Sequence, residues 1–325
     1  MVSRRIWGYR AANRLIYTGY LSFCSCSSFI HLVLSPVEPP IEKPEEPTTP
    51  PSTEDLRTIK IEENIMAVVG TNHWYGIAYG NGQYVAVGAS GYVTTSTDGV
   101  NWTTPKQVGT ANWKSIAYGN GKFVAFNYDG YTSVSTNGTT WTTLKQIASK
   151  RLVGVTFGNE KFVVVGYDGY TSTSTDGTNW STPVQAGVTD ILWFVRYCNG
   201  MFIAGGNGWY MLYSVDGKIW TKSNKSSVNN TRNSVAYGNG KYIMCGGLST
   251  GAIDISTDCI TWQNRTIKPV DTWRDIVYSN NQFVMVGVSG YIATSIDGEI
   301  WTTEQLKDES GKAVTTNLYG IVVVQ

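Results

Sequence analysis

The sequence contains little of the material from which metal centres and disulfide frameworks are built. Its 325 residues include two histidines and five cysteines. A zinc site or a disulfide framework needs paired spacings, and only Cys24 and Cys26 lie close together. We therefore expect no metal and no cofactor. Cys198, Cys245 and Cys259 are expected to be free thiols within β structure, although Cys245 and Cys259 share one repeat and could meet.

Charge is also scarce. Asp, Glu, Lys and Arg make up 15% of the chain, and the formal net charge is +1. No overall field favours nucleic acid or an anionic membrane, so we expect no nucleic-acid partner. Helical periodicity is missing after residue 57, whereas 35 glycines and 20 tyrosines are typical of an all-β protein with many tight turns.

One short pattern, Ser-x-Asp-Gly-x-x-Trp, occurs six times. Asn137 replaces its Asp in the second copy and Cys259 its Gly in the fifth. The intervals between the tryptophans are 39, 39, 40, 42 and 39 residues. A fixed period of this length indicates an array of small supersecondary units. The copies, called the repeat turns below, are residues 96–102, 135–141, 174–180, 214–220, 256–262 and 295–301.

Each unit is predicted to contain four antiparallel strands. Residues 113–118 alternate in polarity, turn through Asn120 and Gly121, and return as residues 122–126. An Asn-Gly pair between alternating apolar runs is the strongest short hairpin signal. A third strand follows a glycine bend, and a fourth is expected to start at the repeat-turn tryptophan. The fold class predicted is all-β, a β-propeller of six four-stranded blades.

The repeat turns have a structural explanation. A Ser or Asp side chain accepts N–H bonds from residues just ahead of it, glycine supplies the left-handed conformation, and tryptophan covers the turn. Asn137 still offers an acceptor oxygen, whereas Cys259 should strain or reshape the fifth turn. The positions predicted to be structural are Asp98, Asn137, Asp176, Asp216, Asp258 and Asp297.

These six stretches resemble the Asp-box, or bacterial neuraminidase (BNR) repeat. That repeat occurs in sialidases, sortilin-type receptors, photosystem II assembly factors and many glycan-active or phage-borne propellers. The resemblance covers roughly residues 66–325 and implies a sialidase-like β-propeller. It also implies that the repeat-turn carboxylates lie away from the ligand face and take no part in catalysis.

The two ends of the chain predict how the ring closes. Residues 65–69 resemble the end of a unit, and residues 318–324 resemble the first strand of one. Because a propeller must leave no open edge, the two ends would close on each other. Six complete blades are therefore predicted, with a seventh, hybrid closing blade from both termini as the alternative.

Three segments are predicted along the chain. Residues 1–35 combine arginines with a moderately apolar run, which favours a signal peptide or membrane anchor, and residues 1–34 are a candidate membrane tether. The alternative is a disordered or mis-started leader. Residues 36–56 hold seven of the ten prolines beside several glutamates, which predicts an extended linker. Residues 57–325 form the propeller.

The candidate binding residues lie on the face opposite the repeat turns. An aromatic residue starts most third strands there, and such rings could stack on sugars or pack a peptide, although packing between blades explains them better because their positions repeat. Positions that break the repeat are the better candidates. The repeat-breaking set is Trp209, Arg196, Tyr128, Asp129, Tyr167 and Asp168, and the recurring set is Tyr92, Tyr131, Tyr170, Tyr210 and Tyr291.

Sialidase chemistry is poorly supported by the sequence. It requires an arginine triad, a tyrosine nucleophile with a glutamate partner and an aspartic acid. Only six arginines lie in the repeat domain, none in the context expected of sialidases, and Glu160 and Glu299 occupy turns. No catalytic residue is therefore assigned, although paired-carboxylate hydrolysis stays open because Asp190, Asp254, Asp271 and Asp275 have no other assigned role.

The sequence thus favours a non-enzymatic recognition or display propeller. We expect it to bind a glycan or a protein through one face, in an extracellular, cell-surface or virion-associated setting such as a phage tail. The near-identity of neighbouring repeats, such as Tyr-Thr-Ser at residues 131–133 and 170–172, favours recent duplication. A sialidase-like glycoside hydrolase and an assembly scaffold are the alternatives.

Overall fold

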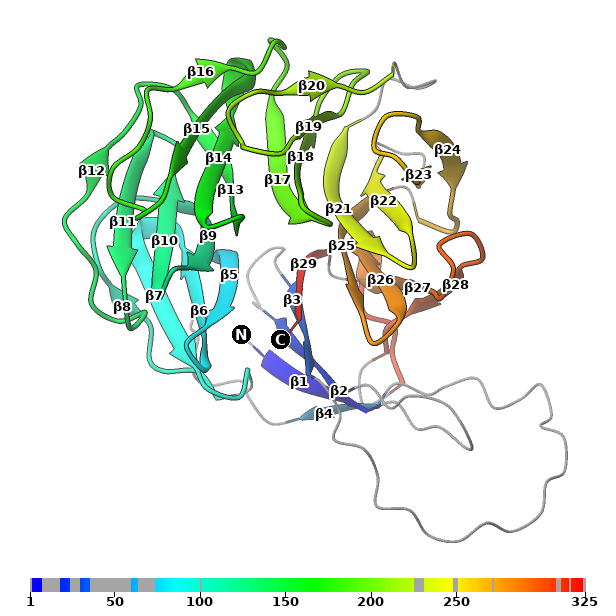
Figure 1. Ribbon diagram of the computed structural model, residues 1–325. Coiled ribbons are helices and arrows are strands. Elements are labelled where there is room, and N and C mark those ends of the chain that lie inside the picture. The colour runs from blue at the N-terminus through cyan, green and yellow to red at the C-terminus, as the bar shows by residue number, and fades with distance from the viewer. Residues whose placement is uncertain are drawn as a thin grey trace, which may run out of the picture.

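The structure is a computed structural model. It describes residues 2–7, 18–23, 30–35, 60–63, 74–99, 101–224, 231–247, 251–270, 272–307, 311–315 and 317–323. Six four-stranded antiparallel sheets stand around a central axis like the blades of a propeller (Figure 1). The six four-stranded blades predicted from the repeat are confirmed.

The strands of each blade follow one another in chain order from the centre of the ring outwards. Blade 1 contains β5 Trp74–Gly80, β6 Gln83–Gly88, β7 Tyr92–Ser96 and β8 Lys106–Gln107. Blade 2 contains β9 Trp113–Gly119, β10 Lys122–Asn127, β11 Tyr131–Ser135 and β12 Lys145–Gln146. Blade 3 contains β13 Leu152–Gly158, β14 Lys161–Gly166, β15 Tyr170–Ser174 and β16 Val184–Gln185. Blade 4 contains β17 Leu192–Cys198, β18 Met201–Gly206, β19 Leu212–Ser214 and β20 Thr221–Lys222. Blade 5 contains β21 Arg232–Gly238, β22 Lys241–Gly246, β23 Ala252–Ser256 and β24 Gln263–Thr266. Blade 6 contains β25 Trp273–Ser279, β26 Gln282–Gly287, β27 Tyr291–Ser295 and β28 Thr302–Gln305.

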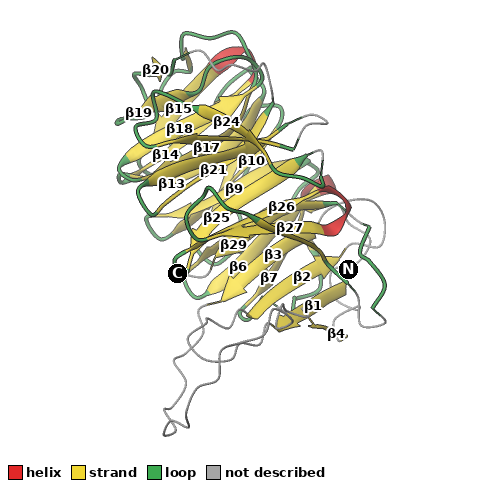
Figure 2. Ribbon diagram, turned by 90° about the vertical axis from the view of Figure 1, so that its right-hand side faces the viewer, coloured by secondary structure: helices red, strands yellow, loops and turns green. Residues whose placement is uncertain are grey.

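A seventh sheet closes the ring. Its order is β29 (Leu318–Val323), β3 (Ile30–Ser35), β2 (Thr18–Phe23), β1 (Val2–Trp7) and β4 (Lys60–Glu63). Strand β29 lies between β25 of blade 6 and β5 of blade 1 and pairs in parallel with β3. This is the hybrid closure from both ends that the alternative described. Figure 2 shows it continuing the stack of blades.

The predicted division into leader, linker and propeller stays a prediction. Strands β1, β2 and β3 fall within residues 1–35, whereas residues 36–56, Cys24, Cys26 and residues 65–69 lie outside the described residues. No helix in the described ranges combines the length and the apolar character that crossing a membrane requires. The three short helices are single 3₁₀ turns at Ala89–Gly91, Tyr167–Gly169 and Val288–Gly290.

The core lies within the blades and between them. After its first residue, the second strand of every blade is buried without interruption, as in β10, where Phe123 to Phe126 are at most 1% exposed. Both faces of such a strand are covered, one by each neighbouring blade, which explains the continuous apolar runs. Cys198, Cys245 and Cys259 are free thiols, and the last two are buried.

The position of the fourth strand was predicted incorrectly in blades 1 to 3. There it is a pair of residues that starts four positions after the repeat-turn tryptophan, as in β8. In blade 1 the residue after the tryptophan, Thr103, uses its hydroxyl to accept the N–H of Thr95, and Thr94 donates to the Thr103 carbonyl. The N–H of Thr103 also donates to the Thr95 carbonyl at 2.8 Å, but no regular ladder follows it, and Pro105 has no N–H to contribute to one.

The repeat turns have the predicted hydrogen bonds. In the sixth turn the N–H groups of Glu299 and Ile300 donate to Asp297, and the Ser295 hydroxyl accepts the N–H of Gly298. In five of the six turns the tryptophan indole donates to the carbonyl of the Gly or Cys position. Cys259 keeps these bonds at a φ of 62°. The fifth turn is therefore strained, as predicted, but it is not reshaped.

Neighbouring blades are also joined by polar contacts from the first hairpin of one blade to the repeat turn of the next. Asn120 and Lys122 of blade 2 donate to the carbonyls of Thr175 and Asp176, at 3.0 and 3.2 Å. The same pair of contacts joins blade 3 to blade 4 and blade 5 to blade 6. At the junction of blades 4 and 5, Asn199 instead donates to the Tyr242 hydroxyl.

The carboxylates of the repeat turns should make the free energy of unfolding depend on pH. The N–H groups of Ile300 and Glu299 lower the pKa of Asp297. A carboxylate whose pKa is lowered by folding stabilises the fold above the unfolded value near 4, and this contribution is lost as the pH falls through the folded value. Replacing Asp297 by Asn should reduce the free energy of unfolding at pH 7 by about 0.5–1.5 kcal/mol, with a smaller difference at pH 3.

Urea unfolding at pH 7, 5 and 3 measures both quantities. The reciprocal variant Asn137→Asp is the matched control, because it restores the missing carboxylate to the second turn and should add stability at pH 7 and pH 5 but little at pH 3. Equal losses for Asp297→Asn at all three pH values would show that the charge contributes nothing.

Candidate functional site

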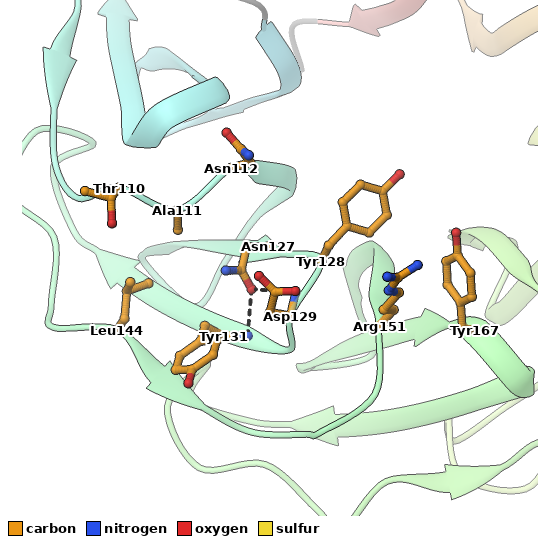
Figure 3. A pocket seen from close by; sticks show the side chains of 10 residues that line it. All are labelled: Thr110, Ala111, Asn112, Asn127, Tyr128, Asp129, Tyr131, Leu144, Arg151 and Tyr167. Atoms are coloured by element: carbon orange, nitrogen blue, oxygen red, sulfur yellow. Dashed lines mark hydrogen bonds between the residues drawn. The ribbon is translucent and has the colours of Figure 1, made fainter.

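The two faces of the ring carry different kinds of loop. The first hairpins and the repeat turns meet on one face, as the contacts from Asn120 and Lys122 establish. Second turns and links between blades lie away from that face. Those of blades 2 and 3 surround a pocket of about 670 Å³ (Figure 3). Its lining residues are Thr110, Ala111, Asn112, Asn127, Tyr128, Asp129, Tyr131, Leu144, Arg151 and Tyr167.

Asn127 fixes the turn that forms one wall of this pocket. Its side chain is 5% exposed, and its amide oxygen accepts the N–H groups of Asp129 and Tyr131 at 3.1 and 2.8 Å. In blades 1, 3, 4, 5 and 6 the second strand ends in glycine instead. The asparagine therefore stabilises a turn particular to blade 2, and Tyr128 and Asp129 are held at its tip.

Aromatic rings and cations alternate from blade 1 to blade 4 beside the pocket. The Lys114 ammonium lies 4.1 Å from the ring centre of Tyr75 and 4.2 Å from that of Tyr128. Further along, the Arg151 guanidinium lies 5.4 Å from the ring centre of Tyr167. Figure 3 shows Tyr128, Arg151 and Tyr167 side by side along the edge of the pocket.

Trp193 of blade 4 extends this row, because its ring meets that of Tyr167 edge-on at 5.9 Å. The residues Tyr75, Lys114, Tyr128, Arg151, Tyr167 and Trp193 are called the aromatic–cation row below. Cation–π contacts of this kind contribute to holding the side chains in place.

Partial burial changes the ionisation of the row. Loss of water lowers the pKa of Lys114, with Tyr167 opposing the shift. Loss of water also raises the pKa of the Tyr128 phenol, and the nearby Arg151 opposes that shift. Tyr128 is therefore a neutral hydroxyl at physiological pH. A cation with part of its water removed interacts more strongly with an anion than a fully hydrated one.

Four of the predicted binding residues meet at the pocket: Tyr128, Asp129, Tyr131 and Tyr167. Asp168 and Tyr170 lie beside them and share Lys150, which is 3.5 Å from the Asp168 carboxylate and 4.8 Å from the Tyr170 ring centre. The remaining predicted residues are elsewhere. Tyr92 begins β7, Trp209 and Tyr210 follow β18 with Tyr210 near Lys222, and Tyr291 packs on the core of blades 5 and 6.

Arg196 lies in a network of its own. Its guanidinium donates to both oxygens of Asp275, at 3.0 and 3.2 Å, and its Nε lies 3.4 Å from the Ser234 hydroxyl. Asp275 also accepts the N–H of Ile321 in β29 at 3.0 Å. Arg196 therefore ties blade 4 to blade 6 and to the closing strand, and it is engaged before any ligand arrives. Its predicted role in binding stays a prediction.

Sequence reasoning missed Lys114, Arg151 and Asn127. All three occupy positions that vary from blade to blade: Lys114 corresponds to Tyr75 and Trp193, and Asn127 to glycine elsewhere. The rule that selected Tyr128 and Tyr167, departure from the repeat, would also have selected them.

Two of the four carboxylates that could have formed a hydrolytic pair are held in ion pairs. Asp254 pairs with Arg232 at 3.2 Å and Asp275 with Arg196 at 3.0 Å. Asp190 lies next to Gly208, and Asp271 is outside the described residues. Within the described ranges, no group of three or more His, Cys, Asp or Glu side chains could hold a metal ion. The arrangement suits ligand binding by rings, hydroxyls and cations.

No protein-family model matches the chain, and no curated protein matches it. Solved structures do. A structure described as YCF48 bound to D1 peptide is 16% identical, covers 77% of this chain and 84% of its own, and has a TM-score of 0.61. YCF48 from Cyanidioschyzon merolae is also 16% identical, with 76% and 88% covered and a TM-score of 0.60.

Virginiamycin B lyase from Staphylococcus aureus is 10% identical, with 78% and 89% covered and a TM-score of 0.66. At this level of identity the likeness concerns the fold, which is a β-propeller.

Proposed function

We propose that this protein is a non-enzymatic recognition propeller that binds a segment of another protein along the aromatic–cation row. The observation that supports this most directly is the pocket between blades 2 and 3, which is walled by Tyr128, Arg151 and Tyr167. Large amphipathic rings and arginine are the side chains enriched at binding hot spots. That a structural neighbour, YCF48, was solved with a D1 peptide supports a peptide as the kind of ligand such a fold can take.

The setting is part of the same proposal. The repeat turns resemble the Asp-box, and we infer membership of the sialidase-like propellers from them, with the repeat-turn carboxylates in a structural role. We further propose a cell-surface, extracellular or virion-associated location, in which a recognition face has something to display. Glycan binding and glycoside hydrolysis are the alternatives to be tested beside peptide binding.

A random peptide library displayed on phage tests the proposal. Panned against the full chain, it should yield enriched sequences. Replacing Tyr128 or Tyr167 by Ala should weaken each enriched peptide about tenfold, because a buried interface ring contributes about 1–2 kcal/mol. Tyr92→Ala is the matched control, since Tyr92 is a tyrosine of the same face that does not line the pocket.

A glycan array and a panel of fluorogenic glycosides, run on the same preparation, provide the opposing outcomes. Turnover of any glycoside would overturn the non-enzymatic assignment. Retention of glycans without any enriched peptide would replace the protein ligand by a carbohydrate.

A further inference from the structure

We infer that the segment bound along the aromatic–cation row is acidic, with carboxylates that meet Lys114 and Arg151. This inference rests on the proposed function, because it assigns the charge of the ligand at that same site. Three observations support it. Among the described residues, Lys114 and Arg151 lack carboxylate partners, they lie over faces of the aromatic rings, and they outnumber the one unpaired carboxylate at the pocket.

Lys114 and Arg151 differ from three other cations of the blades. Lys150 has Asp168, Arg196 has Asp275 and Arg232 has Asp254 as carboxylate partners, all within 3.5 Å. Lys114 and Arg151, in contrast, contact rings, and neither has an ion pair with a carboxylate in the described part of the chain. Two positive charges in one row are therefore left without a neutralising partner.

The surroundings of Lys114 strengthen its interaction with an anion. Lys114 is half-buried between two rings, and Arg151 is exposed at the rim of the pocket. An ammonium held between rings is already positioned, so pairing with a carboxylate costs it little further side-chain entropy. The ring centre of Tyr128 lies 4.2 Å from the Lys114 ammonium, and its neutral hydroxyl is a further hydrogen-bond donor for a carboxylate bound along the row.

The rings themselves favour a peptide over a sugar. Lys114 lies over one face of Tyr75 and one face of Tyr128, and Arg151 lies over one face of Tyr167, so a cation already occupies one stacking surface of each ring. Trp193 meets the Tyr167 ring edge-on. Lys114, Tyr128, Arg151 and Tyr167 thus present charges and hydroxyls along blades 2 and 3, which fits the spaced carboxylates of an extended acidic chain.

One acidic residue opposes this arrangement. Asp129 is exposed and lines the pocket beside Asn127 (Figure 3). Two unpaired cations against one carboxylate leave an excess of positive charge. Removing the Asp129 charge should therefore tighten the binding of an acidic ligand and leave a neutral one unchanged.

Fluorescence polarisation with two matched peptides tests the inference on the full chain. The acidic probe is a labelled dodecapeptide of three Glu-Gly-Glu-Tyr repeats, and the neutral probe has Gln at every Glu. The acidic probe should bind at least about tenfold more tightly at low salt, and the difference should shrink as salt is added. Lys114→Gln and Arg151→Gln should each weaken the acidic probe about fivefold to tenfold and leave the neutral probe unaffected.

Lys218→Gln is the control, because it removes the same charge from a repeat turn on the other face. Asp129→Asn should tighten the acidic probe. Equal affinities for the two probes, or equal losses at Lys218 and Lys114, would overturn the inference. If both probes bind alike and their binding depends on Tyr128, the inference of an acidic ligand fails but the proposed peptide-binding function stands. If neither probe binds and the panned library yields no enriched peptide, the proposed function fails as well. Tighter binding of an oligogalacturonate than of the acidic probe would replace the peptide by an anionic glycan.

Discussion

Replacing Arg232 by Leu should lower the free energy of unfolding by about 3–5 kcal/mol, because it leaves Asp254 as a buried, unpaired charge. The side chains of Arg232 and Asp254 are 2% and 5% exposed and lie 3.2 Å apart. Arg232 also donates to the carbonyl of Gly208 at 2.6 Å. Urea unfolding followed by tryptophan fluorescence measures the loss.

Blade 4 supplies the matched control. The two positions that hold Arg232 and Asp254 in blade 5 hold Leu192 and Leu212 in blade 4, both at most 2% exposed. The double variant Arg232→Leu with Asp254→Leu should therefore recover most of the loss and stay within about 1–2 kcal/mol of the natural protein. If the double variant is as unstable as Arg232→Leu alone, the uncompensated charge is not the cause.

Replacing Gly177 by Ala should be similarly damaging, at about 2–5 kcal/mol, through strain and overpacking together. Gly177 has a φ of +73°, and an added Cβ would lie 2.5 Å from Cγ2 of Val124 in the neighbouring blade. A branched side chain on a buried strand cannot move aside, so the two blades would have to separate. The same unfolding measurement applies.

Gly121 separates the two causes. It has the same φ of +73°, but nothing lies within 4 Å of a Cβ added there. Gly121→Ala should therefore cost only the left-handed strain, about 1–2 kcal/mol. Equal effects of the two substitutions would mean that the closeness of the blades contributes nothing at the repeat turns.

Much of the fold could be predicted because it depends on features that recur. The six copies of the repeat turn predicted the number of four-stranded blades, and the Asn-Gly pairs predicted the positions of first hairpins. The start of the fourth strand could not be predicted, because it depends on hydroxyl contacts between Thr103 and the strand beside it. Such contacts are particular to the packed structure and have no period in the sequence.

The candidate site was predicted less completely, for a related reason. Tyr128 and Tyr167 stood out as departures from the repeat, and the pocket contains both. Arg196 stood out equally, yet it pairs with Asp275, which lies 79 positions later in the chain. A departure from the repeat marks a residue with a particular role, but only the spatial neighbours tell whether that role is binding or closure of the ring.

The closing sheet has a consequence for the order in which the protein can form. Within a blade, paired strands are joined by short turns, so each blade can assemble from local contacts. Strand β29 must find β3, and Leu318 pairs with Ile30 across almost the whole chain. Contacts between such distant residues carry the largest loop-closure entropy and form late. During synthesis, residues 30–35 would therefore wait for residue 318, and the earliest strands made would be among the last to reach their final place.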